Sequence, residues 1–477
     1  MRLDRRHFLA ATAVSAVVPR TAGAAEPVLT PEHFGARGDG VTNDTSAFTA
    51  LSAEVNRRGG GTISLGKGRT YIVGRQIRGG RLGRGGGIAA WAPEPLLELR
   101  DLAAPLMILG NGAIMRAEAA LRFGTFDPQT DQPTHRPMPN YHGTEIASPY
   151  QAMINVQNCR GPVTIRDVEL DGNLPRLRIG GKYGDTGWQL PGSGLLLVDN
   201  HAPETIENVY SHHHGQDGAI VIGDDARSVR SRFSRYVGRY NGRQGLSITG
   251  GRGYDFADCE FSHTGRSALK SAPGAGVDIE AEGKKIVRDL TFTRCKFIDN
   301  VGVGLLAEAG DGADARFSNC LFVGTTAWSA WPRKPGFVFT DCTFVGSAVN
   351  AYASKQPDLA CKFIHCRFTD DPALSPTGKV YIGKGPIVDL GASDNVLFDG
   401  CTFRLVDGAA LPWSWTAIYR DCTMSQRSPT PGETRGKYLG TTTITGRVDL
   451  YSSMVEGTLI VNGRQIPRGP QGGVKPW

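Results

Sequence analysis

The chain has 477 residues, of which 40% are hydrophobic and 21% charged, and its formal net charge is +7. This content is sufficient for a large buried core, and 63 glycines with 28 prolines favour short strands joined by turns over long helices. The positive charge suits an anionic polymer as partner, but the sequence has no basic helix or basic–aromatic motif of a nucleic-acid reader, which argues against nucleic acid.

The N-terminus has the pattern of an export signal. Arg5 and Arg6 precede an apolar run at residues 10–18, and Ala22-Gly-Ala24 is similar to a signal-peptidase site. The pattern resembles a twin-arginine signal, so we expect a signal peptide at residues 1–24 and a periplasmic or extracellular mature chain. The run is too short for a permanent membrane anchor, and no other stretch is apolar enough to span a bilayer.

A compact motif follows, Phe34-Gly-Ala-Arg-Gly-Asp-Gly-Val-Thr-Asn-Asp-Thr-Ser-Ala-Phe. It leads into a helix that we predict over residues 46–57, with Asp44 or Thr45 as its N-cap. Asp39 and Asp44 are interpreted as turn-forming and capping residues rather than as catalytic acids.

This motif resembles the N-terminal cap of the pectate-lyase superfamily, which includes polygalacturonases, polysaccharide lyases and phage tailspikes. The resemblance implies an all-β fold, a right-handed parallel β-helix whose open end is covered by the capping helix. About 40 residues carry the resemblance, and the repeats after them extend the architectural match across most of the chain.

The rest of the chain repeats one short unit. Glycine-led strands recur at intervals of 24, 27, 31 and 28 residues, beginning at Gly194, Gly218, Gly245, Gly276 and Gly304. Such spacing predicts the stacked parallel strands of a solenoid. We expect the β-helix over residues 25–440, and capping strands with a mobile tail over residues 441–477.

Cysteines occupy a fixed place in this unit. Seven of the nine, most of them in a Cys-x-Phe pattern, recur once per repeat: Cys259, Cys295, Cys320, Cys342, Cys366, Cys401 and Cys422. We interpret them as a ladder of small buried thiols. A metal site is disfavoured, because no Cys-x-x-Cys spacing occurs.

The central strands carry a row of ionisable residues. Asp217 precedes one glycine-led strand and Arg243 precedes the next, while Asp278 and Glu280 fall at the water-facing positions of the third. Neighbouring parallel strands lie about 4.8 Å apart, so the row spans two or three sugar rings.

From this row we predict two sets of functional residues. The predicted catalytic residues are Asp217, Arg243, Lys270, Asp278 and Glu280. The predicted substrate-binding residues are His213, Tyr240, Gln244, Glu308 and Trp188.

Three consecutive histidines, residues 212–214, lie just before this row. Side chains alternate along a strand, so no more than two of them can face one groove. A metal cage of histidines is therefore disfavoured relative to a turn with one useful imidazole.

Two chemistries and one non-catalytic role fit the row. Asp278-x-Glu280 beside Arg243 and Lys270 resembles the arrangement in chondroitinase-B-like and alginate lyases. That resemblance implies β-elimination of a uronate polysaccharide, with Ca²⁺ on Asp278 and Glu280 and with Arg or Lys as base. The first alternative is inverting hydrolysis of the polygalacturonase type, although Arg243-Gln244 stands where that family has Gly-His-Gly. A glycan-binding β-helix without activity is the second alternative.

Overall fold

The computed structural model describes residues 27–82, 89–135, 145–181, 190–383, 385–412, 416–428 and 434–472. The predicted signal peptide, Trp188 and the last five residues of the predicted tail lie outside this part of the chain. Within it, no helix has the length and hydropathy needed to cross a membrane.

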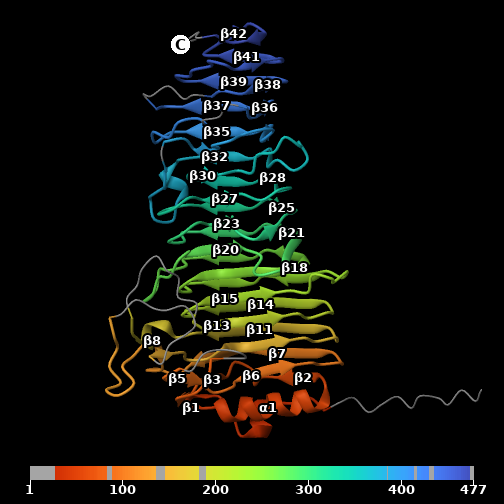
Figure 1. Cartoon of the computed structure of the whole chain (residues 1–477), viewed down its shortest axis with the longest axis vertical. Helices are drawn as coiled ribbons and strands as arrows, with labels where there is room; N and C mark the ends of the chain where they lie inside the picture. Colours follow the sequence, from red (N-terminus) through yellow and green to blue (C-terminus); the bar gives the residue numbers. More distant parts are fainter. Residues whose placement is uncertain are drawn as a thin grey trace, which may run out of the picture.

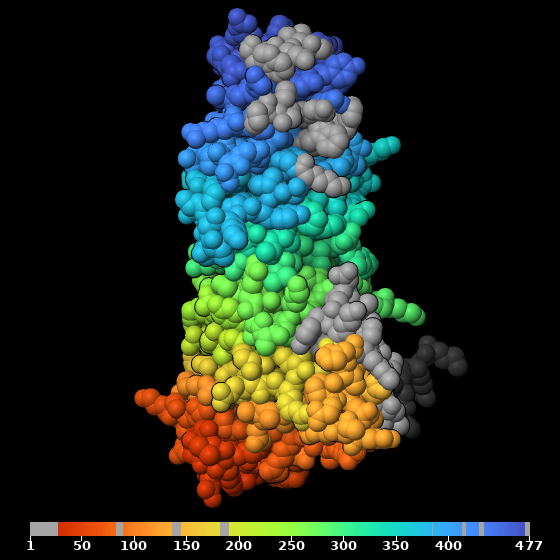
Figure 2. Space-filling view, turned by 90° about the vertical axis from the view of Figure 1, so that its left-hand side faces the viewer, coloured from red at the N-terminus to blue at the C-terminus, as the bar shows by residue number. Residues whose placement is uncertain are grey.

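The chain folds as a right-handed parallel β-helix, which confirms the predicted fold class (Figure 1). Each coil contributes strands to three walls, and each strand pairs in parallel with its counterpart in the next coil. The space-filling view shows sequence colours succeeding one another along a column, so each coil contacts mainly its neighbours (Figure 2).

The first wall carries the predicted functional row and consists of ten strands. They are β6 (Leu97–Arg100), β10 (Ala152–Gln157), β13 (Ser193–Val198), β15 (Asp217–Ile222), the first half of β18 (Gln244–Ala257), β20 (Ala275–Ile279), β23 (Leu305–Ala307), β27 (Ala330–Pro332), β30 (Ala348–Val349) and β33 (Val388–Asp389).

The second and third walls are continuous with each other in the early coils. Single strands there serve both walls: β7 (Leu106–Ala117), β11 (Val163–Asp171) and β14 (Glu204–His212).

The second wall also contains β2 (Gly61–Ser64), β16 (Ser231–Ser234), the second half of β18, β21 (Ile286–Thr293), β24 (Asp311–Gly312), β25 (Ala315–Ser318), β28 (Val338–Thr340), β31 (Lys362–Ile364), β34 (Leu397–Asp399), β36 (Ile418–Arg420), β38 (Lys437–Leu439) and β40 (Met454–Val455).

The third wall also contains β1 (Asp39–Asn43), β3 (Thr70–Val73), β17 (Val237–Arg239), β19 (Glu260–Ser262), β22 (Lys296–Ile298), β26 (Leu321–Val323), β29 (Thr343–Val345), β32 (Arg367–Thr369), β35 (Thr402–Leu405), β37 (Thr423–Gln426), β39 (Thr441–Thr445) and β41 (Thr458–Val461).

A separate five-stranded sheet lies beside the first coils. It is formed by β4 (Gln76–Arg78), β5 (Trp91–Pro93), β8 (Arg122–Thr125), β9 (Ile146–Ala147) and β12 (Arg178–Ile179). Three short 3₁₀ helices complete the described elements: Pro31–Phe34, Leu174–Arg176 and Pro372–Leu374.

The bend between the second and third walls uses a left-handed backbone conformation. Asn208, Asp258 and Asn319 occupy it in three different coils, with φ of 52°, 57° and 55°. Asn and Asp tolerate this conformation better than other residues with a side chain, because their short polar groups bond locally. The sequence thus sets the corner of each coil with one residue.

Aromatic rings and thiols stack from coil to coil in the core. Phe317 is fully buried between Phe292 and Phe339, with ring centroids 4.8 and 4.6 Å away. All nine cysteines are buried and free, and the Cys320 N–H donates to Sγ of Cys342 at 3.4 Å. The predicted ladder of unpaired thiols is confirmed.

The two ends of the column are covered differently (Figure 1). Helix α1 (Thr45–Arg58) covers the first coil, close to the predicted 46–57. Asp44 stands at its N-cap, but its carboxylate accepts from the N–H groups of Arg37 and Gly38 and so closes the preceding turn. At the other end, parallel stacking continues through β41, and antiparallel β42 (Arg464–Ile466) and β43 (Gly469–Pro470) follow.

The stacked core gives a direct stability prediction. Replacing Phe317 with Ala removes a fully buried ring between two others, so we expect the free energy of unfolding to fall by about 3–5 kcal/mol. Arg316→Ala, at an exposed position on the same strand, should change it by less than about 0.5 kcal/mol. Urea unfolding followed by circular dichroism measures both, and equal midpoints for the two variants would contradict the stacked core.

Candidate functional site

A chain of polar contacts crosses three neighbouring strands of the first wall. Asp217 is paired in register with Gln244, and Ser247 with Asp278. Arg243 donates from Nη1 to Oδ2 of Asp217 and to Oε1 of Gln244, each at 3.2 Å. Gln244 in turn donates from Nε2 to Oδ2 of Asp278 at 2.5 Å. The register of parallel strands therefore places an acid, a guanidinium, an amide and a second acid in one line.

The amide of Gln244 has a fixed orientation in this line. Its oxygen accepts from Arg243 and from the Ser247 hydroxyl, while its nitrogen donates to Asp278. A reversed amide would set its NH₂ group against the guanidinium of Arg243, which cannot accept, so this contact assigns the oxygen to that side.

Four of the predicted residues line one cavity of about 300 Å³. Its charged lining consists of Arg243, Asp278, Glu280 and Glu308. The rest of the lining is uncharged: Ala272, Pro273, Leu306 and Ala309. Arg243, Asp278 and Glu280 of the predicted row thus line one open pocket on the outside of the first wall.

Asp217 has a different position from the one predicted. It is fully buried and does not line the pocket; its Oδ2 lies 3.2 Å from Nη1 of Arg243. Burial raises its pKa to about 6, although the charge of Arg243 opposes the shift. We therefore interpret Asp217 as the residue that positions Arg243, and not as a group that reaches substrate.

The prediction that Asp278 faces water is wrong. Its side chain points away from the core, opposite to the buried Val277 and Ile279, yet it is only 3% exposed. The loop with Ala272 and Pro273 forms another side of the same pocket. Strand alternation predicts which way a side chain points but not whether a loop covers it.

Burial has a clear electrostatic consequence for Asp278. It raises the pKa of the carboxyl to about 7, and the neighbouring charge of Glu280 adds to the shift, while Arg243 and Gln244 oppose it. Its Oδ1 has no hydrogen-bond partner among the described residues. Because Gln244 donates to Oδ2, a proton on this carboxyl belongs on Oδ1. Near neutral pH the pocket therefore holds a carboxyl group able to act as a donor.

The remaining predicted residues lie in different places. Glu308 lines the pocket and is paired with Arg333 at 3.0 Å. Lys270 is exposed in the loop between β19 and β20 and does not line the pocket. Trp188 lies outside the described residues.

His213 and Tyr240, predicted to contact substrate, do not line the pocket. They follow strands of the third wall, where His213, Tyr240 and His263 occupy the same left-handed corner in successive coils. The rings of His213 and Tyr240 stack with centroids 5.1 Å apart, and the His263 ring is tilted by 37° against Tyr240 at 4.7 Å. They form a row of rings at the edge of this wall.

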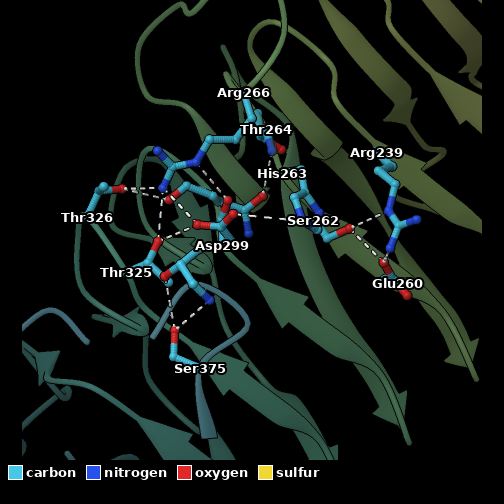
Figure 3. A network of polar contacts seen from close by, with 12 residues as sticks. Arg239, Glu260, Ser262, His263, Thr264, Arg266, Asp299, Thr325, Thr326 and Ser375 are labelled. Atoms are coloured by element: carbon cyan, nitrogen blue, oxygen red, sulfur yellow. Dashed lines mark hydrogen bonds and ion pairs between the residues drawn. The ribbon is translucent and has the colours of Figure 1, made fainter. Parts of the chain in front are cut away.

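Polar contacts continue this row along the column (Figure 3). Arg239 donates to Glu260 and to Ser262, at 2.6 and 3.1 Å. Further along, Arg266 donates to Asp299 at 2.8 Å. The four charged side chains named here thus form two pairs of opposite charge, Arg239 with Glu260 and Arg266 with Asp299.

The three consecutive histidines do not alternate, because His212 ends β14 and His213 lies in the left-handed corner that follows it. His214 is buried, 2.9 Å from the Tyr150 hydroxyl and 3.0 Å from the Leu170 carbonyl. His212 and His213 instead converge on Asp171, a residue to which the sequence analysis gave no role. Asp171 lies 41 residues before His212, and only the pairing of β11 with β14 brings them side by side.

Comparison with known proteins supports the fold. A family described as "Right handed beta helix region" matches residues 152–344, which include most of the first-wall strands described above. No curated protein matches the sequence.

Several solved structures resemble this one at low identity. The A-module of mannuronan C-5 epimerase AlgE4 from Azotobacter vinelandii is 15% identical over 94% of this chain and 99% of that one, with a TM-score of 0.43. The N-terminal fragment of bacteriophage phi29 gene product 12 is 13% identical over 94% of this chain and 74% of that one, with a TM-score of 0.46. PfbA, a surface adhesin of Streptococcus pneumoniae, is 12% identical over 91% and 89%, with a TM-score of 0.38. At these values, function has to be argued from the site itself.

The raised pKa of Asp278 predicts a pH-dependent stability. The folded state keeps this proton up to about pH 7, whereas the unfolded state loses it near the ordinary value of 3.8. The free energy of unfolding therefore falls as pH rises from 4 to 7, by at most about 1.4 kcal/mol per unit of pKa shift. Asp278→Asn removes this loss, so the variant should exceed the wild type in stability at pH 8 and match it near pH 4.

Urea unfolding at both pH values measures the difference. Glu308→Gln is the control, because Glu308 is 41% exposed in its side chain and its removal should change little at either pH. A loss of stability in Asp278→Asn that is equal at pH 4 and pH 8 would show that the carboxyl is not held protonated by burial.

Proposed function

We propose that this protein is a carbohydrate-active enzyme that cleaves an anionic, uronate-containing polysaccharide by β-elimination in the Arg243–Asp278–Glu280 pocket. The observation that supports it best is a guanidinium and a buried carboxyl of raised pKa on the wall of one open pocket. The first step of such a reaction needs groups that neutralise the substrate carboxylate, and these two can do so together.

Arg243 and Asp278 take complementary roles in this reaction. Asp217 and Gln244 hold the Arg243 guanidinium in place, so it does not need to reorganise when a carboxylate enters. Asp278, protonated, donates from Oδ1 to the same carboxylate without repelling it. Neutralising the substrate carboxylate makes the adjacent C5 proton easier to remove.

Glu280 is the proposed base. It lines the pocket two residues beyond Asp278 on the same face of the chain. Its carboxylate takes the C5 proton, the C5–H electron pair forms the C4–C5 double bond, and the C4–O4 bond breaks. The departing oxygen takes a proton from solvent on the open side of the pocket.

Calcium remains part of the proposal on narrower grounds. Asp278 and Glu280 are the predicted pair of ligands, and Glu308 lines the same pocket. Calcium takes six to eight oxygen ligands. Among the described residues, however, these carboxylates do not form a group whose oxygens approach as closely as those of a metal site. The guanidinium of Arg243 is positively charged, as Ca²⁺ is, so it is the alternative group for neutralising the substrate carboxylate. Loss of activity in EDTA that Ca²⁺ restores assigns this role to calcium, and activity that persists in EDTA assigns it to Arg243.

Inverting hydrolysis is the second candidate, and the pKa of Asp278 favours it. A carboxyl that keeps its proton to about pH 7 suits a general acid, and Glu280 beside it suits a general base that activates water. The products differ: elimination gives an unsaturated sugar that absorbs in the ultraviolet, and hydrolysis gives reducing ends only.

The site variants should separate these roles once a substrate has been found in a panel of uronate polysaccharides. We expect Glu280→Gln and Arg243→Ala each to lower kcat at least about 100-fold, because each removes a group that acts on the reacting sugar. Lys270→Ala is the matched control and should keep wild-type turnover, since Lys270 lies outside the pocket. Wild-type turnover in Glu280→Gln would place the chemistry elsewhere.

Asp278→Asn distinguishes elimination from hydrolysis in the same assay. Asn still donates a hydrogen bond to a carboxylate but cannot transfer a proton to a leaving group. Elimination therefore predicts residual activity that no longer falls above pH 7, whereas hydrolysis predicts its loss at every pH. Binding of a polysaccharide without any product would leave a glycan-binding protein.

Export through the twin-arginine pathway is proposed from the sequence pattern of residues 1–24. Replacing Arg5 and Arg6 together with Lys should retain the precursor in the cytoplasm, because the pathway reads that pair. Cell fractionation and immunoblotting measure the distribution, and normal periplasmic accumulation of the double variant would contradict the proposal.

A further inference from the structure

A compact group of nitrogen and oxygen donors lies at the edge of the third wall, outside the pocket. Asp171 ends β11, His212 ends β14, and the strands pair these two residues in register. His213 follows in the left-handed corner, with φ of 54°. One donor atom from each of the three lies within 4.8 Å of the others.

We propose that Asp171, His212 and His213 bind one divalent transition-metal ion of the Zn²⁺ type. The donor set decides the class of ion. Two imidazole nitrogens and one carboxylate oxygen suit Zn²⁺ and neighbouring first-row ions, whereas Ca²⁺ takes oxygen ligands only. The site is independent of the acidic pocket and of the reaction proposed there.

The distances match a site that needs little adjustment. Nδ1 of His212 lies 2.6 Å from Nδ1 of His213 and 3.7 Å from Oδ1 of Asp171. Two nitrogens on a tetrahedral Zn²⁺, each about 2.05 Å from the ion, lie about 3.3 Å apart. Opening the imidazole pair by less than about 1 Å therefore admits the ion, while Asp171 already lies near the required separation.

Neighbouring groups orient the donors as they do around metal ligands. Oε1 of Glu169 is 3.2 Å from Nε2 of His212, and a carboxylate there accepts a proton on Nε2. In neutral His212 this leaves the lone pair on Nδ1, the atom that faces His213. Arg116 donates to Oδ2 of Asp171 at 2.7 Å, and the Asn173 N–H donates to Oδ1 at 2.8 Å. Oδ1 faces the imidazoles and keeps a second lone pair for the ion. A carboxylate behind a ligating histidine is the usual outer-shell arrangement.

Both imidazole rings are held by stacking. Tyr210 stacks on His212, with centroids 4.1 Å apart and planes inclined by 27°. Tyr240 stacks on His213, with values of 5.1 Å and 16°. Gly172 permits the close approach, because a Cβ at this position would lie 2.3 Å from the carbonyl oxygen of His213. The donors are thus preorganised by the fold rather than gathered from mobile loops.

Three protein ligands leave room for a fourth. Asp171 also lines a cavity of about 520 Å³ together with Arg116 and Arg176. Water, or an anionic group attracted by the two arginines, can complete a tetrahedral site from this side. The alternative without metal is a hydrogen bond between the two Nδ1 atoms, which the same experiment tests.

The test uses the untagged mature protein, stripped with a chelator and dialysed. Isothermal titration with Zn²⁺ should show one ion bound per chain at micromolar or lower dissociation constant. Co²⁺ in its place should give the visible absorption bands of a tetrahedral nitrogen–oxygen site. A millimolar excess of Ca²⁺ should not compete.

Variants assign the ion to the three residues. His212→Gln, His213→Gln and Asp171→Asn should each weaken Zn²⁺ binding at least about 100-fold, and Glu169→Gln about 10- to 100-fold. His263→Gln is the matched control, since His263 occupies the same corner in a later coil and contacts the Tyr240 ring without joining the group. Circular dichroism verifies that each variant is folded, and the proposal is tested only on folded ones.

Two outcomes would overturn the proposal. One is the absence of stoichiometric Zn²⁺ or Co²⁺ binding in the folded wild-type protein, which would leave the hydrogen-bonded imidazole pair. The other is binding that His212→Gln and His213→Gln retain while His263→Gln or another histidine variant loses it.

Discussion

The hydrogen bonding of one coil to the next constrains everything else in this molecule. Parallel pairing places each residue directly against its counterpart in the next coil, so a residue type repeated at the coil period becomes a continuous stack. Phe292, Phe317 and Phe339 show the result in the core. The same register acts on polar residues outside the core, where it assembles Asp217, Gln244 and their neighbours into a line.

Burying that line has an energetic cost. Asp217 and Asp278 have raised pKa values because burial disfavours their charged forms, and the single guanidinium of Arg243 offsets this only in part. A fold stabilised by stacked Phe rings and thiols along many coils tolerates a local loss of a few kcal/mol in the free energy of unfolding. Carboxyl groups whose pKa is raised by burial are common where a side chain must donate or transfer a proton near neutral pH. The raised pKa of Asp278 is the physical basis of the proposed chemistry.

The fold was predictable because its signals are local and periodic, whereas only part of the candidate site shares those properties. The glycine-led strands and Cys-x-Phe repeats gave the stack, and the same alignment brought Arg243, Asp278 and Glu280 to one pocket. Burial of Asp278 depends on a loop of irregular length, which strand alternation does not describe. Asp171 carries no repeated motif, so its place beside His212 followed only from the register of two long strands.

The corner between β14 and β15 links the two candidate sites physically. Only residues 213–216 separate His212, the last residue of one strand, from Asp217, the first of the next. His214 anchors this corner in the interior through the Tyr150 hydroxyl and the Leu170 carbonyl. This anchored corner leads from His213, at the edge of the third wall, to Asp217, which accepts from Arg243 at 3.2 Å. One short segment, anchored by a buried imidazole, therefore carries two of the proposed metal ligands and the residue that positions Arg243.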